Sequence, residues 1–285
     1  MEYKKSIIKL INERTSTRTY DGRGLEKEHL DELNTYLDKI NQEIKIKARF
    51  TIVSNLGTDK EESKKLGTYG FIQGANTYII GIMDKDNNDA FEFGYVFEKI
   101  ILFATDLGIQ TCWLGGTFSK DNFQQFAGLN ENEFIAIITP VGYKKEKMRV
   151  FETAMRTTIS ADKRKPWNEL FFNKSMKSLD EDEVGEFKIP LEMVRLGPSA
   201  SNKQPWRIIK DENTFHFYVC RNKGYGIAGY DLQKNDIGIA KCHFDLTLKE
   251  LGIKGSWQEL KSVNVPDNWE YIVSWIMNLK EKIID

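Results

Sequence analysis

The chain has 285 residues, of which 40% are hydrophobic and 12% aromatic, which is enough for about two ordinary domains or one large one with a real core. This composition excludes a disordered chain, a collagen and a coiled coil. The 41 basic and 42 acidic residues leave a formal net charge of −1. We therefore expect no nucleic-acid partner, because general binding to nucleic acid requires a positive surface, and any anion site must be local.

The amino-terminal residues contain no apolar export segment, and no apolar run approaches the ~18 residues of a membrane span. We expect a soluble, cytoplasmic protein with no membrane partner. The cysteines and histidines show no spacing typical of a disulfide framework or a metal site, so we expect neither and assign chemistry to an organic cofactor, carboxylates or hydroxyls. These residues are Cys112, Cys220, Cys242, His29, His216 and His243.

Apolar residues at helical spacing predict a short helix over Ile7 to Ile11 and a second one over Leu30 to Ile40. A broad apolar stripe from Phe93 to Leu107 predicts a largely buried helix that ends at Gly108. Helices and strands are mixed along the chain. The expected strands are Arg49 to Ser54, Tyr78 to Met83, Phe134 to Pro140, Trp206 to Lys210, Thr214 to Cys220 and Glu270 to Ile276.

The stretch from about Phe151 to Glu186 is polar and charged, and it reads as a connection between two halves. Sliding the chain by 144 residues pairs Ala90 to Trp113 with Lys234 to Trp257. Six of the 24 positions are then identical, including Gly94 with Gly238 and each Leu-Gly-Ile, and an acid two residues before each glycine. We infer that the halves are diverged copies.

A polar loop between the first two helices carries Arg14, Ser16 and Arg18. In an extended segment these alternate residues share one face, so both guanidiniums and the hydroxyl could converge on one phosphate. The alternative is a solvated basic loop.

A second candidate segment runs from Leu196 to Trp206 with the sequence Leu-Gly-Pro-Ser-Ala-Ser-Asn-Lys-Gln-Pro-Trp. Its prolines restrict the backbone, and its small polar residues offer amides and carboxamides to a planar polar ligand. The alternative is a helix-to-strand turn in which Trp206 anchors the core. That alternative explains the prolines and the tryptophan, but not the polar run from Ser199 to Asn202 followed by Gln204.

Taken together, these motifs resemble those of the FMN-dependent nitroreductase family. The shared features are Arg-x-Ser-x-Arg near the amino terminus, Pro-Ser-Ala-Ser-Asn-x-Gln-Pro-Trp running into a strand, and acid-x-Gly before a long helix that ends in Leu-Gly-Ile-x-x-x-Trp. The match extends from Arg14 to about Trp257. The resemblance implies an α+β fold, an α/β/α sandwich in which two diverged copies form a pseudo-dimer.

Each half has what the other lacks. Residues 1–152 carry the phosphate-binding loop, and residues 153–285 carry the Pro-Ser-Ala-Ser-Asn loop. We therefore expect a monomer with one complete FMN site and a degenerate second site. Arg156, at the corresponding start of the second half, is expected to be a plain surface residue that does not affect flavin binding.

The family pattern suggests further cofactor contacts. Leu114, Gly115 and Gly116 resemble the segment whose backbone N–H approaches flavin N5, where glycine leaves room for the ring; the alternative is an ordinary turn. Lys147 and Arg149, with Lys145, follow the strand after which the family places basic residues; the alternative is a charged tail. Cys112 is expected to be a packed core residue. The full cofactor set is Arg14, Ser16, Arg18, Leu114, Gly115, Gly116, Lys147, Arg149, Pro198, Ser199, Ala200, Ser201, Asn202 and Gln204.

The resemblance implies that NAD(P)H reduces FMN and that the flavin reduces a small electron-poor acceptor, such as a nitroaromatic or a quinone, by a ping-pong mechanism. No side chain is then required as an acid or base. Two alternatives are a flavin-binding protein with little or no turnover and a family enzyme of specialised chemistry. The stretch from Leu56 to Gly74 is the candidate lid for the latter.

Overall fold

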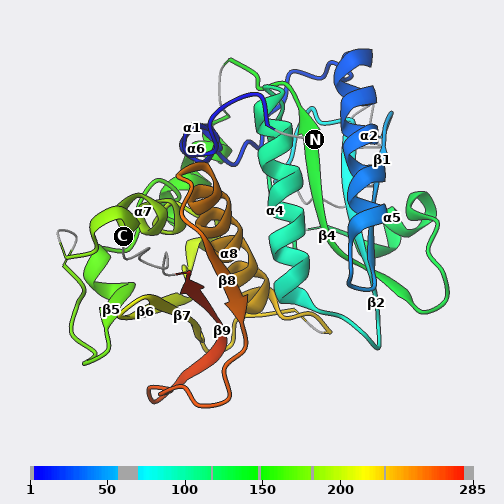
Figure 1. Ribbon diagram of the computed structural model, residues 1–285. Coiled ribbons are helices and arrows are strands. Elements are labelled where there is room, and N and C mark those ends of the chain that lie inside the picture. Colours follow the sequence, from blue (N-terminus) through cyan, green and yellow to red (C-terminus); the bar gives the residue numbers. More distant parts are fainter. Residues whose placement is uncertain are drawn as a thin grey trace, which may run out of the picture.

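The computed structural model describes residues 3–56, 70–116, 118–146, 149–180, 183–227 and 229–278. Two β-sheets lie on either side of a pair of long helices (Figure 1). Most of the candidate lid, residues 57–69, lies outside the described residues.

The first sheet has the order β1-β2-β4-β3, and every neighbouring pair is antiparallel. Its strands are β1 (Ala48–Val53), β2 (Thr77–Asp84), β3 (Gln110–Thr111) and β4 (Glu133–Gly142). β2 is buried along nearly its whole length, as its continuous apolar sequence predicts for a central strand.

The second sheet has the order β5-β6-β7-β9-β8. Its strands are β5 (Phe171–Asn173), β6 (Trp206–Asp211), β7 (Thr214–Cys220), β8 (Gly255–Gln258) and β9 (Trp269–Met277). β5 pairs in parallel with β6, and the other pairs are antiparallel. The series β6-β7-β9-β8 therefore repeats the pairing of β1-β2-β4-β3.

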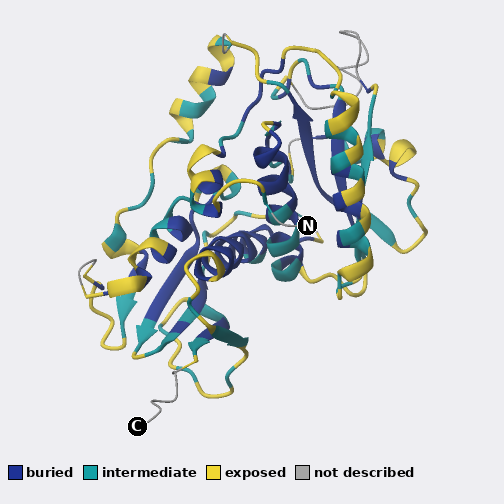
Figure 2. Cartoon of the chain, turned by 45° about the horizontal axis from the view of Figure 1, so that its top comes forward, coloured by how far each residue is buried: buried dark blue, intermediate teal, exposed yellow. Residues whose placement is uncertain are grey.

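The two central helices are α4 (Ala90–Asp106) and α8 (Leu232–Glu250), which lie side by side (Figure 1). Phe93 and Phe97 of α4 pack into the core of the first sheet, whereas Ile237 and Phe244 of α8 pack into that of the second. Because each helix also contacts the other helix, α8 is buried over almost its whole length (Figure 2).

The repeated Leu-Gly-Ile sequence ends both central helices in the same way. Gly108 and Gly252 have φ angles of +77° and +71°, a conformation that favours glycine at a helix end. The N–H of Ile109 donates to the carbonyl of Ala104 at 2.9 Å, and the N–H of Ile253 donates to that of Leu248 at 3.0 Å. Since 248 is 104 plus 144, the hydrogen bonds follow the repeat found in the sequence.

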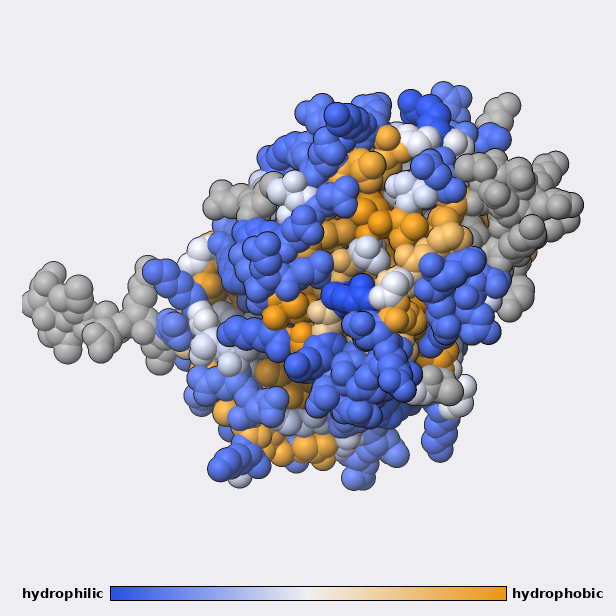
Figure 3. Space-filling view, turned by 90° about the vertical axis from the view of Figure 1, so that its right-hand side faces the viewer, coloured by the Kyte–Doolittle hydropathy of each residue, from blue (hydrophilic) through white to orange (hydrophobic). Residues whose placement is uncertain are grey.

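Further helices surround this centre. One side of the molecule shows hydrophobic surface bordered by hydrophilic side chains (Figure 3). Tyr36, in the helix of residues 27–43, stacks on Phe103 of α4 at a centroid distance of 4.0 Å. None of the helices in the described ranges is long and apolar enough to cross a membrane. The α-helices are α1 (Ile7–Glu13), α2 (Lys27–Glu43), α5 (Lys120–Ala127), α6 (Val150–Thr158) and α7 (Lys188–Arg195), and the 3-10 helices are η1 (Trp167–Glu169), η2 (Gly185–Phe187) and η3 (Ala200–Asn202).

The three helices and six strands predicted from the sequence are present, which confirms the mixed α+β class. The stretch after Phe151, which the sequence presents as a polar connection, contains regular elements: α6 occupies residues 150–158, and β5 adds a strand to the second sheet. Phe151, Met155 and Ile159 lie four residues apart, a helical spacing that the surrounding polar residues obscure.

Candidate cofactor site

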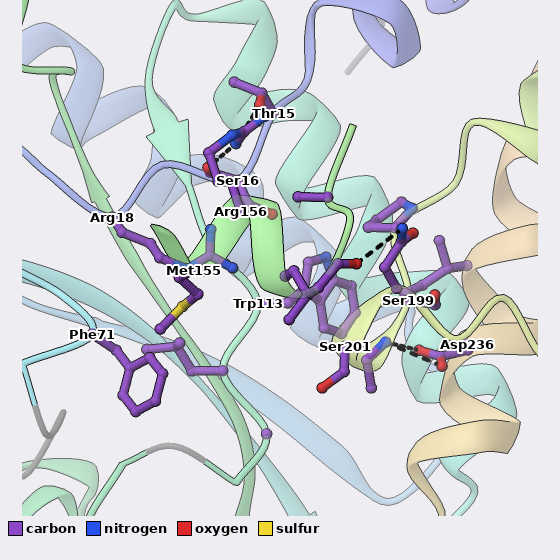
Figure 4. A pocket seen from close by; sticks show the side chains of 18 of the residues that line it. Thr15, Ser16, Arg18, Phe71, Trp113, Met155, Arg156, Ser199, Ser201 and Asp236 are labelled. Atoms are coloured by element: carbon purple, nitrogen blue, oxygen red, sulfur yellow. Dashed lines mark hydrogen bonds between the residues drawn. The ribbon is translucent and has the colours of Figure 1, made fainter. Parts of the chain in front are cut away.

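A cavity of about 740 Å³ lies between segments from both halves of the chain. Its walls come from the loop after α1, residues 113–116, α6, the loop before β6 and α8. Figure 4 shows Arg18, Met155 and Phe71 on one side of this space and Ser199, Ser201 and Asp236 on the other, with Trp113 between them. The volume falls within the range of about 300–1,000 Å³ typical of small-molecule sites.

Arg14, Ser16 and Arg18 all line the cavity, and so does Thr15, whereas the hydroxyl of Thr17 donates to Gln110. The loop is pinned beside β3, since the N–H of Thr17 donates to the carbonyl of Thr111 at 2.9 Å. The structure thus brings the three predicted residues to the wall of one cavity.

The two arginines of this loop are buried, each with 9% exposure. Arg14 Nε and Arg18 Nη1 donate no hydrogen bond to any described residue. Burial lowers the pKa of Arg14, and Glu98, whose Oε1 lies 4.0 Å from Arg14 Nε, opposes that shift. Buried guanidinium atoms without acceptors are costly, so an anion in the cavity would satisfy them.

Helix α6 bonds to the loop that carries Arg14 and Arg18. Glu152 is buried and accepts from the N–H of Arg18 at 3.0 Å and from the hydroxyl of Thr19. One turn later, Arg156 donates to the carbonyl of Ser16 at 3.2 Å, pairs with Asp162 and lines the cavity. The expectation that Arg156 is a plain surface residue is therefore wrong, because α6 places its guanidinium beside the Arg14–Arg18 loop.

Arg164 is a further cation of the cavity that the sequence reasoning missed. Its guanidinium donates to the carbonyls of Ala161 and Leu196 at 2.9 and 3.1 Å. Burial, together with the positive charge of Arg14 and Arg195, lowers its pKa to about 10. Arg164 lies within the sequence Lys163-Arg164-Lys165, and from the sequence alone such a run of charges is equally consistent with a solvent-exposed segment.

The loop before β6 contributes Pro198, Ser199, Ala200, Ser201 and Asn202 to the cavity wall. The φ angles of Ser201, Asn202 and Gln204 are +45°, +56° and +48°, which is a strained left-handed conformation for residues other than glycine. The Ser199 hydroxyl accepts from the N–H of Gln204 at 2.8 Å and stabilises the turn.

Gln204 belongs to the predicted cofactor set but does not line the cavity. Its Oε1 accepts from the N–H of Lys165 at 2.8 Å, and its amide nitrogen donates to Asn202. Trp206 is fully buried in the core of the second sheet, as expected for an anchor.

Asp236 of α8 is a cavity residue whose role the sequence reasoning did not assign, although its repeat position opposite Glu92 had marked it. Only 2% of the residue is exposed, and both carboxyl oxygens lie 3.2 Å from the N–H of Ala200 (Figure 4). Burial raises the pKa of Asp236 well above its usual range, which favours the neutral acid.

Leu114, Gly115 and Gly116 line the cavity beside Trp113. Leu114 exchanges backbone hydrogen bonds with Ile138 of β4 at 3.0 Å, which fixes the segment on the sheet. A Cβ on Gly115 would lie 2.7 Å from Leu232 Cδ2, so only glycine fits without movement of that side chain. Cys112 is buried in the adjacent core, as predicted.

Of the predicted basic residues after β4, Lys147 lies outside the described residues. Arg149 is turned to other partners and is absent from the cavity wall: its guanidinium donates to Thr19 Oγ1 at 3.1 Å and to the carbonyls of Gly70 and Phe71 at 3.1 and 3.2 Å. Across the described ranges, no group of three His, Cys, Asp or Glu side chains could hold a metal ion.

The two sheets, the paired central helices and a cavity lined by arginines define a protein of mixed helix-and-sheet fold. A family model described as "Putative TM nitroreductase" matches residues 6–248, and the chain belongs to this family. No curated protein matches the chain.

Among solved structures, the chain is similar to a putative nitroreductase from Thermotoga maritima, with 20% identity, a TM-score of 0.60, and coverage of 98% of this chain and 97% of that one. This similarity supports the nitroreductase-like fold over the full length. A nitroreductase family protein from Clostridium difficile matches with 23% identity, a TM-score of 0.41, and coverage of 57% and 94%. An FMN-dependent nitroreductase from the same organism matches with 22% identity, a TM-score of 0.39, and coverage of 49% and 88%.

Proposed function

We propose that the protein is an FMN-dependent oxidoreductase that passes electrons from NAD(P)H to a small electron-poor acceptor, such as a nitroaromatic or a quinone, by a ping-pong mechanism. Membership of a nitroreductase family supports oxidoreductase activity in general. The observation that carries the cofactor assignment is the pair of buried arginine atoms without acceptors at the cavity wall, Arg14 Nε and Arg18 Nη1.

The residues of the cavity fit FMN at both of its chemical ends. The phosphate would be held by Arg14, Ser16 and Arg18 of the first half and by Arg156 of α6. The apolar part of the wall, which includes Trp113, Leu114 and Ile137, would contact the ring system. Guanidinium groups and apolar surface in one cavity suit a ligand with a phosphate tail and an aromatic head.

When bound, FMN supplies the hydride and electron transfer, so the residues of this chain bind, orient and exclude water. The loop 198–202 would bond the polar edge of the cofactor through its backbone and hydroxyls. Gly115 and Gly116 would present backbone N–H groups to the ring without a side chain in the way. Asp236 holds the loop in place through the N–H of Ala200.

The proposed arrangement is a pseudo-dimer within one chain, with halves 1–152 and 153–285 joined through α6. It is supported by the repeated strand pairing and by the reciprocal contact between the helices. A Cβ on Gly94 would meet the carbonyl oxygen of Asn235 at 2.2 Å, and one on Gly238 would meet that of Phe91 at 2.0 Å. Because 235 is 91 plus 144, each helix meets the other through equivalent positions, as in a two-fold contact.

The repeat also supports a single site per chain. Trp113 and Asp236 face the cavity, and their repeat partners are Trp257 and Glu92. Those partners surround Lys241, whose ammonium pairs with Glu92 and lies 4.8 Å from the ring centroid of Phe91 and 5.4 Å from that of Trp257. We infer from these contacts that side chains of the chain occupy the position equivalent to the cavity.

The purified chain saturated with FMN tests the proposal. We expect a flavin absorption band at one FMN per chain, bleaching on addition of NADH or NADPH, and return of the band when a nitroaromatic or a quinone is added. A ratio near two would overturn the single-site assignment. Stoichiometric flavin without bleaching would favour a flavin-binding protein with little or no turnover, and the absence of bound flavin would overturn the cofactor assignment.

A further inference from the structure

A second depression, of about 390 Å³, opens beside the cofactor cavity. It lies between residues 158–165 and the loop 201–204. Thr158, Ile159, Arg164, Ser201 and Asn202 line both spaces. A ligand could therefore reach from one into the other.

Four cations line this groove, namely Lys163, Arg164, Lys165 and Lys203. None of them forms an ion pair with an acid in the described part of the chain. The neighbouring Asp162 pairs with Arg156 and acts on Arg164 through its charge without an ion pair, and Glu169 acts on Lys165 in the same way. The groove is a concentrated positive site on a chain whose overall net charge is −1.

The loop 201–204, which forms one wall of the groove, is hydrogen-bonded to the basic segment 160–165 opposite. The Asn202 amide nitrogen donates to the carbonyls of Ser160 and Lys163 at 2.7 and 2.9 Å. Gln204 accepts from the N–H of Lys165 at 2.8 Å. These bonds hold the left-handed turn at Ser201, Asn202 and Gln204, so backbone strain is maintained at the groove.

The lysine side chains of the groove reach its surface. Lys163 and Lys203 are exposed, and Lys165 is half-buried. The ammonium of Lys203 lies 5.8 Å from the ring centroid of Tyr225, and the hydroxyl of Tyr225 donates to Ser201 at 2.7 Å. Since Tyr225 lines the cofactor cavity, it links the two spaces.

We propose that this groove binds the phosphates of the nicotinamide dinucleotide and favours NADPH through its 2′-phosphate. The proposal rests on the proposed function, because the reduced nicotinamide must enter the adjacent cavity. A phosphate monoester adds about −1.5 to −2 of charge near neutral pH, whereas the pyrophosphate is common to NADH and NADPH. The guanidinium of Arg164 is already bonded to backbone carbonyls, so its charge contributes while the three lysines supply the donors. Their combined positive charge exceeds what the pyrophosphate requires, and lysine is suited to the additional phosphate.

Calorimetric titration of the FMN-loaded chain with adenosine 2′,5′-bisphosphate tests the proposal, since this probe carries the 2′-phosphate and no nicotinamide. Adenosine 5′-monophosphate and inorganic phosphate are the comparison ligands. We expect the bisphosphate to bind at least tenfold more tightly than either. The double variant Lys163→Ala/Lys203→Ala should lose at least tenfold in affinity for the bisphosphate, whereas Lys261→Ala, an exposed lysine away from the groove, should match the wild type.

Equal affinities for the bisphosphate and the monophosphate, or an unchanged affinity in the double variant, would overturn the proposal. Equal binding of inorganic phosphate would assign the groove to a free anion and would also overturn it. Flavin fluorescence gives the FMN affinity of the double variant, which we expect to remain within twofold of the wild type. Because the titration can also be run without flavin, a chain that binds the bisphosphate but not FMN would support the groove and refute the proposed function.

Discussion

Gly94 on α4 and Gly238 on α8 each lie against the backbone of the other helix, at positions 144 residues apart in the chain. A Cβ at Gly94 would overlap the carbonyl oxygen of Asn235, and one at Gly238 would overlap that of Phe91. Backbone atoms cannot rotate away as a flexible side chain can. The contact between the two helices, and with it the cavity that lies between the halves, depends on these two glycines.

Gly94→Ala and Gly238→Ala should therefore destabilise the fold. Overpacking typically lowers the free energy of unfolding by about 1–3 kcal/mol. Alanine is a better helix former than glycine, and this gain of up to about 1 kcal/mol reduces the net loss. Chemical denaturation of the two variants measures the change. Gly24→Ala is the matched control, because its Cβ would meet no atom within 4 Å, and its stability should stay within about 0.5 kcal/mol of the wild type. Unchanged stability of both helix variants would contradict the close contact.

Arg18→Ala should weaken FMN binding by about ten- to a hundredfold, because a hydrogen bond to a charged group contributes about 1.5–3 kcal/mol. Arg156→Ala should also weaken it, by about tenfold, since Arg156 lines the same cavity and supports the carbonyl of Ser16. Dissociation constants from flavin fluorescence at fixed ionic strength test both variants.

Arg23→Ala is the control for this pair of substitutions, because Arg23 is exposed and bonded to Asp21 away from the cavity. We expect its flavin affinity to stay within about twofold of the wild type. Identical affinities for all three variants would remove the support for the phosphate assignment.

The chain should sediment as a monomer, with or without FMN, if the second half takes the place of a partner subunit. Sedimentation equilibrium over a wide range of protein concentrations measures this state. An obligate dimer would contradict the pseudo-dimer, and a flavin shared between chains would do so most directly.

Glu133 and Arg49 should make stability dependent on pH in acid. The carboxylate of Glu133 accepts from Arg49 Nε at 2.9 Å and Nη2 at 2.7 Å, and these bonds lower its pKa from the usual 4.5 to about 2. A depressed folded-state pKa stabilises the fold above pH 4.5, and this stabilisation disappears as the pH falls from 4.5 to 2.

Glu133→Gln should thus cost about 1 kcal/mol at pH 7, a value limited by solvent screening, and the difference from the wild type should shrink below pH 4.5. Denaturation midpoints of both proteins between pH 2 and pH 7 measure the effect. A difference that stays constant across this range would show that the charge of Glu133 does not stabilise the fold.

The order of elements was readable from the sequence because apolar periodicity reports burial directly. The stripe from Phe93 to Leu107 predicted α4, and the repeated Leu-Gly-Ile predicted two equivalent helix ends, which the structure contains. The alternation of Arg14, Ser16 and Arg18 likewise predicted a shared face, since an extended backbone leaves few other arrangements.

Contacts distant in sequence could not be read in this way. Arg149 and Arg156 have the same charge and lie seven residues apart, yet only Arg156 lines the cavity, because α6 directs it there while backbone carbonyls bind Arg149. Gln204 and Asn202 looked like ligand-binding groups, but their amides also hold the segment from Ser160 to Lys165.

The sequence by itself determined the mixed class and the position of the arginine loop between two helices, because these depend on local backbone geometry and on the burial of apolar residues. Only the tertiary structure decided which charged side chains meet. The type of a charged residue does not indicate whether its side chain lies on the surface or in a cavity. The difference between them is set by the packing of α6 and the loop 196–204 around the cavity, which buries Arg14 and Arg18 and leaves two of their nitrogen atoms without acceptors in the described structure.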